Sequence, residues 1–121
     1  MTTSELQATV RERDGVAVID LTGDLNSSAE DALNEAYAEA TGSGAGAVVL
    51  NFERAEYINS TGIALIVGLL AQARANRVDV KAFGLSDHYR EIFEITRLAD
   101  FMTIADNENG AVDGAERSNH A

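Results

Sequence analysis

Two adjacent hydroxyl side chains, those of Ser60 and Thr61, have the setting in this chain that best suits chemistry. They follow Asn59, precede Gly62 and stand directly before the apolar run IALIVGLLA at residues 63–71. Serine and threonine are favoured at helix N-caps, so the sequence predicts that one of the two caps the helix formed by this run. The unpaired N–H groups and the dipole at a helix start also favour an anion. A phosphate on one hydroxyl would add roughly −1.5 to −2 charges beside an apolar helix face and could therefore switch a protein–protein contact.

Other side chains that carry out catalysis or bind metals are scarce. The chain has no cysteine and only two histidines, His88 beside Asp87 and His120 near the C-terminus, and it lacks the Gly-x-Ser-x-Gly segment of many serine hydrolases. The segment DNENG at residues 106–110 resembles a calcium loop, but its glycine falls one position early. The glycine-rich residues 42–46 lack the Lys-Ser/Thr ending of a phosphate-binding loop. We therefore expect a protein that is not an enzyme and that holds neither a metal nor a cofactor.

The charge balance restricts the partners of the protein. Nine Lys and Arg against twenty Asp and Glu give a formal net charge of −11, which disfavours nucleic acid and anionic membrane surfaces because both need clustered cations. The longest apolar run, residues 63–71, is about half as long as a membrane-spanning helix. The first residues lack the basic and apolar segments of a signal peptide. The sequence thus predicts a cytoplasmic domain that inserts into no membrane and binds no nucleic acid directly.

The strands are indicated by apolar alternation and by turn residues. Leu6, Ala8 and Val10 alternate with polar residues, which is typical of a half-buried strand. Asp14-Gly15 favours a hairpin turn into the next strand. The polar residues 53–59 predict a loop between a strand and the helix after it. In all, apolar stretches predict four strands, at about residues 6–11, 16–22, 47–52 and 78–83.

Three helices are expected between and after these strands. Ser27 followed by Glu30 forms a capping box for the first helix, in which apolar residues recur every three to four positions. The second helix spans about residues 61–76, and Ser86 is expected to cap the third. Residues 98–104 hold a last apolar cluster that suits a short helix, a strand or a turn.

The order of these elements predicts the fold class. A β-hairpin followed by alternating strands and helices is typical of an α/β two-layer fold, here with a four- to five-stranded mixed sheet and helices mainly on one face. Residues 1–105 make up this domain. Residues 106–121 carry one bulky apolar side chain, Val112, and are expected to form an acidic, disordered tail.

The helix at residues 61–76 is unusual because it is apolar nearly all round. A surface helix in a small domain normally has a polar face, but here Gln72 and Arg74 are the first polar side chains after the cap. Two interpretations stay open. The helix is either buried on several sides, or part of its apolar face is a docking surface.

Three parts of the sequence resemble the STAS domain of bacterial anti-sigma factor antagonists. GDLN at residues 23–26 is similar to the family's Gly-Glu/Asp-Leu/Ile-Asp segment before the first helix. VVLNF at residues 48–52 and YINSTGI at residues 57–63 resemble its strand and its Asp-Ser-Ser/Thr-Gly-Leu loop. FGLS at residues 83–86 and IFEITRL at residues 92–98 resemble the strand and helix near the family's end. On these motifs nearly the whole of the folded chain is identified as a STAS-type α/β domain.

The resemblance implies a binding module with a phosphorylation switch. In the antagonists, the serine after the loop aspartate is phosphorylated by a partner kinase that is also the anti-sigma factor. The unphosphorylated form binds that kinase and frees a sigma factor. By position the phosphoacceptor here is Ser60, with Thr61 as a second hydroxyl. The resemblance also implies that a set of five residues lies at the partner contact: Asp24, Asn26, Asn59, Gly62 and Ile63.

The chain departs from the family pattern at two positions of this motif set. Asn26 and Asn59 stand where the family has acidic residues, so a basic partner surface would lose two charge-assisted contacts. A second STAS role therefore stays open, that of a subunit which binds the ATPase of an ABC-type phospholipid-transport complex without phosphorylation. The resemblance also implies a phosphatase as a further partner. The apolar helix leaves both a monomer and a weak homodimer open.

Overall fold

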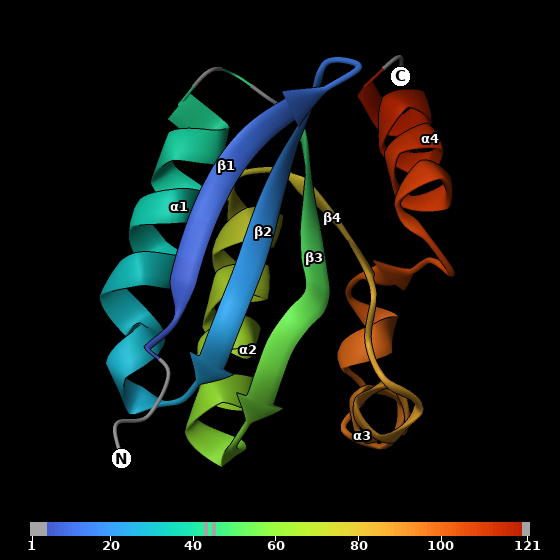
Figure 1. Cartoon of the computed structure of the whole chain (residues 1–121). Helices are drawn as coiled ribbons and strands as arrows, with labels where there is room; N and C mark the ends of the chain where they lie inside the picture. The colour runs from blue at the N-terminus through green and yellow to red at the C-terminus, as the bar shows by residue number, and fades with distance from the viewer. Residues whose placement is uncertain (1–4, 43, 45, 120–121) are drawn as a thin grey trace.

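A five-stranded mixed sheet forms the centre of the computed structural model, which describes residues 5–42, 44 and 46–119 (Figure 1). The strands lie in the order β1-β2-β3-β4-β5, with β1 antiparallel to β2 and all later neighbours parallel. The α/β class and the mixed sheet that the sequence predicts are thereby confirmed. The strands are β1 Gln7–Arg13, β2 Val16–Leu25, β3 Ala47–Ile58, β4 Asp79–Phe83 and β5 Thr103–Ile104.

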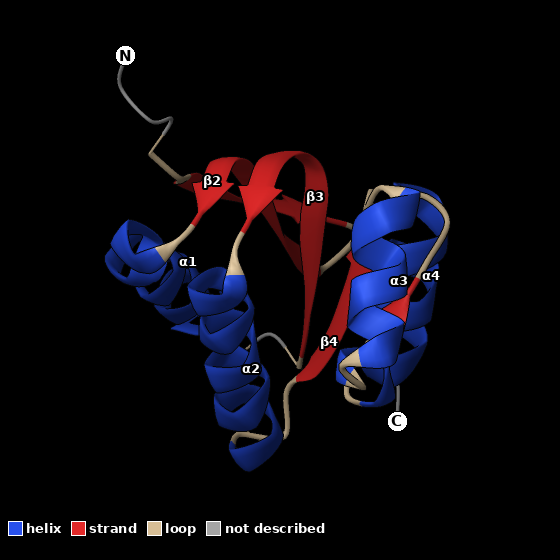
Figure 2. Ribbon diagram, turned by 90° about the horizontal axis from the view of Figure 1, so that it is seen from below, coloured by secondary structure: helices blue, strands red, loops and turns tan. Residues whose placement is uncertain are grey.

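Helices cover both faces of this sheet (Figure 2). Two of them, α1 and α2, pack on the face that holds the larger core, and Phe93 of α3 belongs to the same core. The fourth, α4, packs on the opposite face against a second, smaller core. The described residues form α1 Glu30–Gly42, α2 Ser60–Ala75, α3 Asp87–Ile95 and α4 Glu108–Asn119, together with the short 3-10 helices η1 Ser27–Ala29 and η2 Leu98–Asp100.

The hairpin at the start of the chain follows the sequence prediction. Asp14 and Gly15 both have positive φ, at 53° and 82°, as a two-residue turn of type I′ requires. Leu6 is buried, and Ala8 and Val10 pack against the larger core. The alternation along β1 is therefore the one that the sequence indicates.

Strand β3 is longer than the sequence suggests. The polar residues 53–58, expected to form a loop, continue the strand because they remain paired with β2 as far as Leu25↔Ile58. The neighbour on the other side ends earlier, since the last β3–β4 pair is Asn51↔Phe83. Beyond Asn51, β3 is an edge strand, and polar side chains are common on such edges.

The segment after residue 105 corrects the prediction of a disordered tail. It forms α4 as far as Asn119, and Asn107 caps this helix by accepting a hydrogen bond of 2.8 Å from the N–H of Gly110. Ala111 and Val112 are buried against valines of β2 and β3 and against Phe83. A small apolar patch is sufficient here because the sheet surface beneath it is itself fully apolar, with valines of β2 and β3 beside Phe83 of β4. His120 lies outside the described residues.

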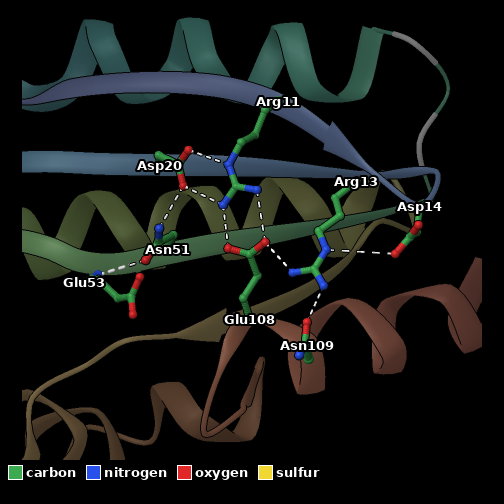
Figure 3. Close-up of polar contacts among 8 residues, drawn as sticks. All are labelled: Arg11, Arg13, Asp14, Asp20, Asn51, Glu53, Glu108 and Asn109. Carbon is green, nitrogen blue, oxygen red and sulfur yellow. Dashed lines mark hydrogen bonds and ion pairs between the residues drawn. The ribbon is translucent and has the colours of Figure 1, made fainter.

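A network of charged residues holds the start of α4 to the sheet (Figure 3). Glu108 accepts a hydrogen bond of 2.6 Å from Arg11 and one of 2.5 Å from Arg13. Arg11 also contacts Asp20 at 2.7 Å, and Asp20 accepts a hydrogen bond of 2.8 Å from Asn51. The network therefore joins β1, β2 and β3 to α4.

These contacts lower the pKa values of the two carboxylates in the network, those of Glu108 and Asp20. The hydrogen bond from Arg11, together with that from Arg13, outweighs partial burial and lowers the pKa of Glu108 to about 2. Burial raises the pKa of Asp20, but the hydrogen bonds from Arg11 and Asn51 outweigh it and hold that pKa below its ordinary value. Both carboxylates are therefore charged at neutral pH, and their charge is stabilised by the guanidinium groups.

Candidate functional site

The two motif loops meet at the carboxyl ends of β2 and β3. These strands are parallel neighbours and end in register, with Leu25 opposite Ile58. The N–H of Asn59 donates a hydrogen bond of 3.1 Å to the carbonyl of Leu25, which fixes one loop to the other. The structure thus brings Asn26 and Asn59, which are far apart in sequence, to the same edge of the sheet.

Asn59, and not Ser60 or Thr61, caps helix α2. Its side-chain oxygen accepts a hydrogen bond of 2.8 Å from the N–H of Gly62. The expectation that a hydroxyl caps this helix is therefore wrong. Asparagine is as good an N-cap as serine because its short side chain reaches the same N–H group.

The same correction applies to the loop after β2. Asn26 caps the helical segment that follows, and its side-chain oxygen accepts hydrogen bonds from the N–H of Ser28 at 3.0 Å and from its hydroxyl at 2.6 Å. The expected capping box from Ser27 is replaced by this contact, since a turn of 3-10 helix precedes α1. At α3, in contrast, the cap by Ser86 is confirmed. Both asparagines that depart from the family pattern are therefore N-caps.

Gly62 allows the start of α2 to approach β2 closely. A Cβ atom at this position would lie 2.1 Å from the carbonyl oxygen of Leu25, which is far inside van der Waals contact. Gly62 itself is buried, and its expected place at the partner contact stays a prediction. It positions the helix, and Ile63 beside it is half-buried against the core.

The hydroxyls of Ser60 and Thr61 are exposed at the first turn of α2. Neither forms a hydrogen bond with a residue that the structure describes, since the cap is supplied by Asn59. A hydroxyl in this position is accessible to a modifying enzyme. A phosphate on it would lie beside the N–H groups of the first turn, where an anion is favoured.

Tyr57 is a site residue that the sequence reasoning did not single out. Its side chain is 55% exposed, and it lies opposite Asp24 in the β2–β3 ladder. Exposed tyrosines are enriched in protein interfaces. The signal in the sequence was an aromatic residue inside an otherwise polar stretch, which was expected to be a loop.

Tyr89 of α3 binds the end of strand β3, next to the site. Its hydroxyl oxygen accepts a hydrogen bond of 3.0 Å from the N–H of Ile58, the last residue of β3. Because β4 ends earlier, this N–H has no strand partner on that side. Tyr89 therefore holds the end of β3, and with it the position of Asn59.

Helix α2 combines the two interpretations that its sequence left open. Ile66, Leu69, Leu70 and Ala73 are buried against the sheet. The outer side also consists of apolar or small residues, and it continues from the exposed hydroxyls at the helix start. This outer side, the exposed α2 face, comprises Ala64, Val67, Gly68 and Ala71.

Other expected features can now be placed. His88 is exposed at the start of α3, beside the ring of Tyr89. Within residues 5–119, as far as they are described, no three His, Asp or Glu side chains form a group that could hold a metal ion. No helix in the described part of the chain is long and apolar enough to cross a membrane.

The arrangement of these loops on the sheet agrees with a known family. The sequence profile of the STAS domain matches residues 7–111. The chain therefore belongs to the STAS domain family. The match reaches into α4, which the sequence reasoning left outside the domain.

Curated relatives carry antagonist names. The chain is 27% identical over 106 residues to BtrV of Bordetella bronchiseptica, named for a proposed role as an anti-sigma factor antagonist, and the match covers 88% of this chain and 91% of BtrV. It is 37% identical over 57 residues to the anti-sigma-B factor antagonist of Staphylococcus aureus, a match that covers 47% of this chain and 53% of that protein.

Solved structures show the same fold. An anti-sigma factor antagonist from Mycobacterium paratuberculosis superposes with a TM-score of 0.80 at 16% identity, over 93% of this chain and 95% of that one. The phosphorylated form of SpoIIAA, a Bacillus cell fate determinant, gives a TM-score of 0.65 at 25% identity, over 88% of this chain and 96% of that one.

Proposed function

We propose that this protein is an anti-sigma factor antagonist that acts by partner switching. In its unmodified form it binds an anti-sigma factor kinase through the edge of the sheet where the two motif loops meet, and the sigma factor is released. Phosphorylation of Ser60 by that kinase ends the contact. The names of the relatives support the class of function, and the solved phosphorylated SpoIIAA supports phosphorylation as its chemistry.

The observation that carries this proposal is that Asn59, and not Ser60, caps helix α2. Asn59 makes the capping hydrogen bond, whereas the hydroxyl of Ser60 is exposed and contributes none within the described chain. A phosphate on Ser60 would therefore leave the cap intact. Its charge would instead act on whatever covers Tyr57 and the exposed α2 face, through repulsion and desolvation.

The two asparagines have a defined consequence in this scheme. Asparagine keeps the capping contact of an aspartate but not its charge, so the loops retain their shape at Asn26 and Asn59. A kinase that recognises carboxylates there would bind this chain more weakly. The proposal therefore includes a partner whose surface at this point is less basic than is usual for the family.

The test is a phosphorylation assay with purified proteins. The wild-type chain, Ser60→Ala and Thr61→Ala are each incubated with radiolabelled ATP and every anti-sigma factor kinase encoded by the native host. The proposal predicts that one kinase labels the wild-type chain and Thr61→Ala but not Ser60→Ala. If no kinase labels or binds the wild-type chain, and a transporter ATPase binds it instead, the alternative role as a transport subunit replaces this one.

A further inference from the structure

A shallow apolar groove lies far along α2 from Ser60. It runs between the C-terminal half of this helix and the segment around η2, and has a volume of about 260 Å³. Its walls include Val67, Leu98 and Phe101, and the side chains of Val67 and Phe101 are 47% and 57% exposed. Small ligands are usually enclosed much more completely than so open a groove allows. The geometry therefore suits a side chain presented by another protein.

The groove is continuous with a second, more polar hollow of about 510 Å³. The two share Leu70, Arg74 and Phe101, and the guanidinium of Arg74 lies 5.9 Å from the centre of the Phe101 ring. Arg77 also lines this hollow. An apolar cleft thus opens directly onto two arginines.

These arginines give the rim a charge opposite to that of the whole molecule. The two carboxylates of the hollow have cationic partners, since Asp79 contacts Lys81 at 3.0 Å and Asp100 contacts Arg97 at 2.9 Å. Neither Arg74 nor Arg77 forms an ion pair with any described residue. Two cations without an ion pair to a described residue therefore lie together in a chain of net charge −11.

The backbone at Arg77 fixes where this cation lies relative to the groove. Arg77 follows the end of α2 in the left-handed conformation, with φ at 60°. The N–H of Arg77 bonds to the carbonyl of Arg74 and that of Val78 to Ala73, which is the hydrogen-bond pattern that glycine normally completes. Arg97 occupies the equivalent position after α3, with φ at 67°. Arginine is less stable than glycine in this conformation, although its charge is favoured at the C-terminus of a helix.

We propose that the groove and its two arginines form a second docking site at the other end of α2 from Ser60, which adjoins the exposed α2 face at Val67 and Ala71. Its occupant is a segment of a partner protein that carries a bulky apolar side chain followed by carboxylates. The apolar side chain fills the groove beside Phe101, and the carboxylates pair with Arg74 and Arg77. The charge complementarity favours this occupant over a symmetric contact with the same groove of a second copy, which would place the arginines of the two copies together.

The test is a titration with synthetic peptides followed by amide NMR shifts of the full chain. One peptide carries a Leu-Phe pair followed by two glutamates. Two matched peptides carry lysines in place of the glutamates or serines in place of Leu-Phe. We expect the first peptide to shift the amides of residues 74–78 and 98–101 and to bind about tenfold more tightly than either control.

Two variants make this test specific. Arg77→Gly should raise the melting temperature, because glycine adopts the left-handed conformation without strain. The same variant should bind the acidic peptide about threefold more weakly, because one cation is lost. Asp14→Gly is the matched control, since Asp14 is also left-handed but lies in the β1–β2 hairpin. It should leave peptide binding unchanged.

Three results would overturn the proposal. They are equal binding of the acidic and basic peptides, no shift at the groove with any peptide, and groove shifts that depend on the concentration of the protein alone. The last result would mean that a second copy of the chain covers the groove. None of these results depends on the kinase, so the proposal can fail without affecting the role of Ser60.

Discussion

The side-chain oxygen of Asn59 accepts a hydrogen bond of 2.8 Å from the N–H of Gly62, so the residue before Ser60 caps helix α2. The hydroxyl of Ser60 is thereby left without a part in holding the fold. Helix capping and phosphate acceptance, which the sequence alone would assign together to Ser60, are therefore divided between Asn59 and Ser60. This division allows the charge at position 60 to change while the first turn of the helix keeps its shape.

The first prediction concerns Ser60 and stability. Ser60→Ala and Ser60→Asp should each change the free energy of unfolding by less than about 0.5 kcal/mol, because no hydrogen bond is lost. Ser86→Ala should cost about 1 kcal/mol, since Ser86 does cap its helix. Urea unfolding measures all three. A large loss of stability in Ser60→Ala would show that the hydroxyl is structural.

The second prediction concerns the cap itself. Asn59→Ala should destabilise the protein by about 1 kcal/mol, whereas Asn59→Asp should retain the stability because aspartate caps equally well. With a kinase that accepts Ser60, Asn59→Asp should also be phosphorylated faster, through a charge-assisted contact. An unchanged rate in Asn59→Asp would mean that the kinase does not contact this position.

The third prediction concerns the approach of α2 to β2. Gly62→Ala should destabilise the protein by about 2 kcal/mol or more, because its Cβ would lie 2.1 Å from the carbonyl oxygen of Leu25. The matched control is Gly68→Ala on the same helix, where a Cβ meets nothing within 4 Å. That control should be neutral or stabilising, since alanine is the better helix former. Thermal unfolding of both variants tests the pair, and similar losses in the two would contradict the close approach.

The fourth prediction concerns pH and α4. The pKa of Glu108 is lowered from 4.5 to about 2 in the folded protein, so the unfolded chain takes up the proton first as the pH falls. The stabilisation by Glu108 is therefore complete above about pH 5 and is lost as the pH drops towards 2.

Glu108→Gln tests this dependence. It should lose roughly 1–2 kcal/mol at pH 7, a figure reduced for the partial exposure of the ion pairs. Its stability should then fall less steeply than that of the wild type between pH 5 and 2. Glu39→Gln, which removes an exposed carboxylate of α1, is the control. Parallel curves of stability against pH for the wild type and Glu108→Gln would show that the ion pairs of Glu108 do not stabilise the fold.

Local patterns in the sequence were sufficient to predict most of the fold. The alternation along β1, the turn at Asp14-Gly15 and the cap at Ser86 involve residues close in the chain, and each was found from spacing alone. The position of Ser60 at a helix start was found in the same way. The STAS motifs then identified the fold family.

The features that the sequence did not reveal depend on distant partners. The burial of Ala111 and Val112 requires the small side chains of β2 and β3 beneath them, and Glu108 meets Arg11 across nearly the whole chain. The strand character of residues 53–58 depends on their pairing with β2, which is distant in the sequence. The choice of Asn59 over Ser60 as the cap depends on where the helix begins, within a single residue, which propensity does not resolve.

The most direct measurement of the central claim is mass spectrometry on the tagged protein isolated from its native host. Trypsin releases Ser60, Thr61 and Tyr57 together in one peptide, residues 55–74, so fragmentation assigns the phosphate to a single hydroxyl. We predict a phosphate on Ser60 in a fraction of the protein, and co-purification of an anti-sigma factor kinase with the unmodified fraction only. An unmodified Ser60 together with a transporter ATPase as the bound partner would contradict the account.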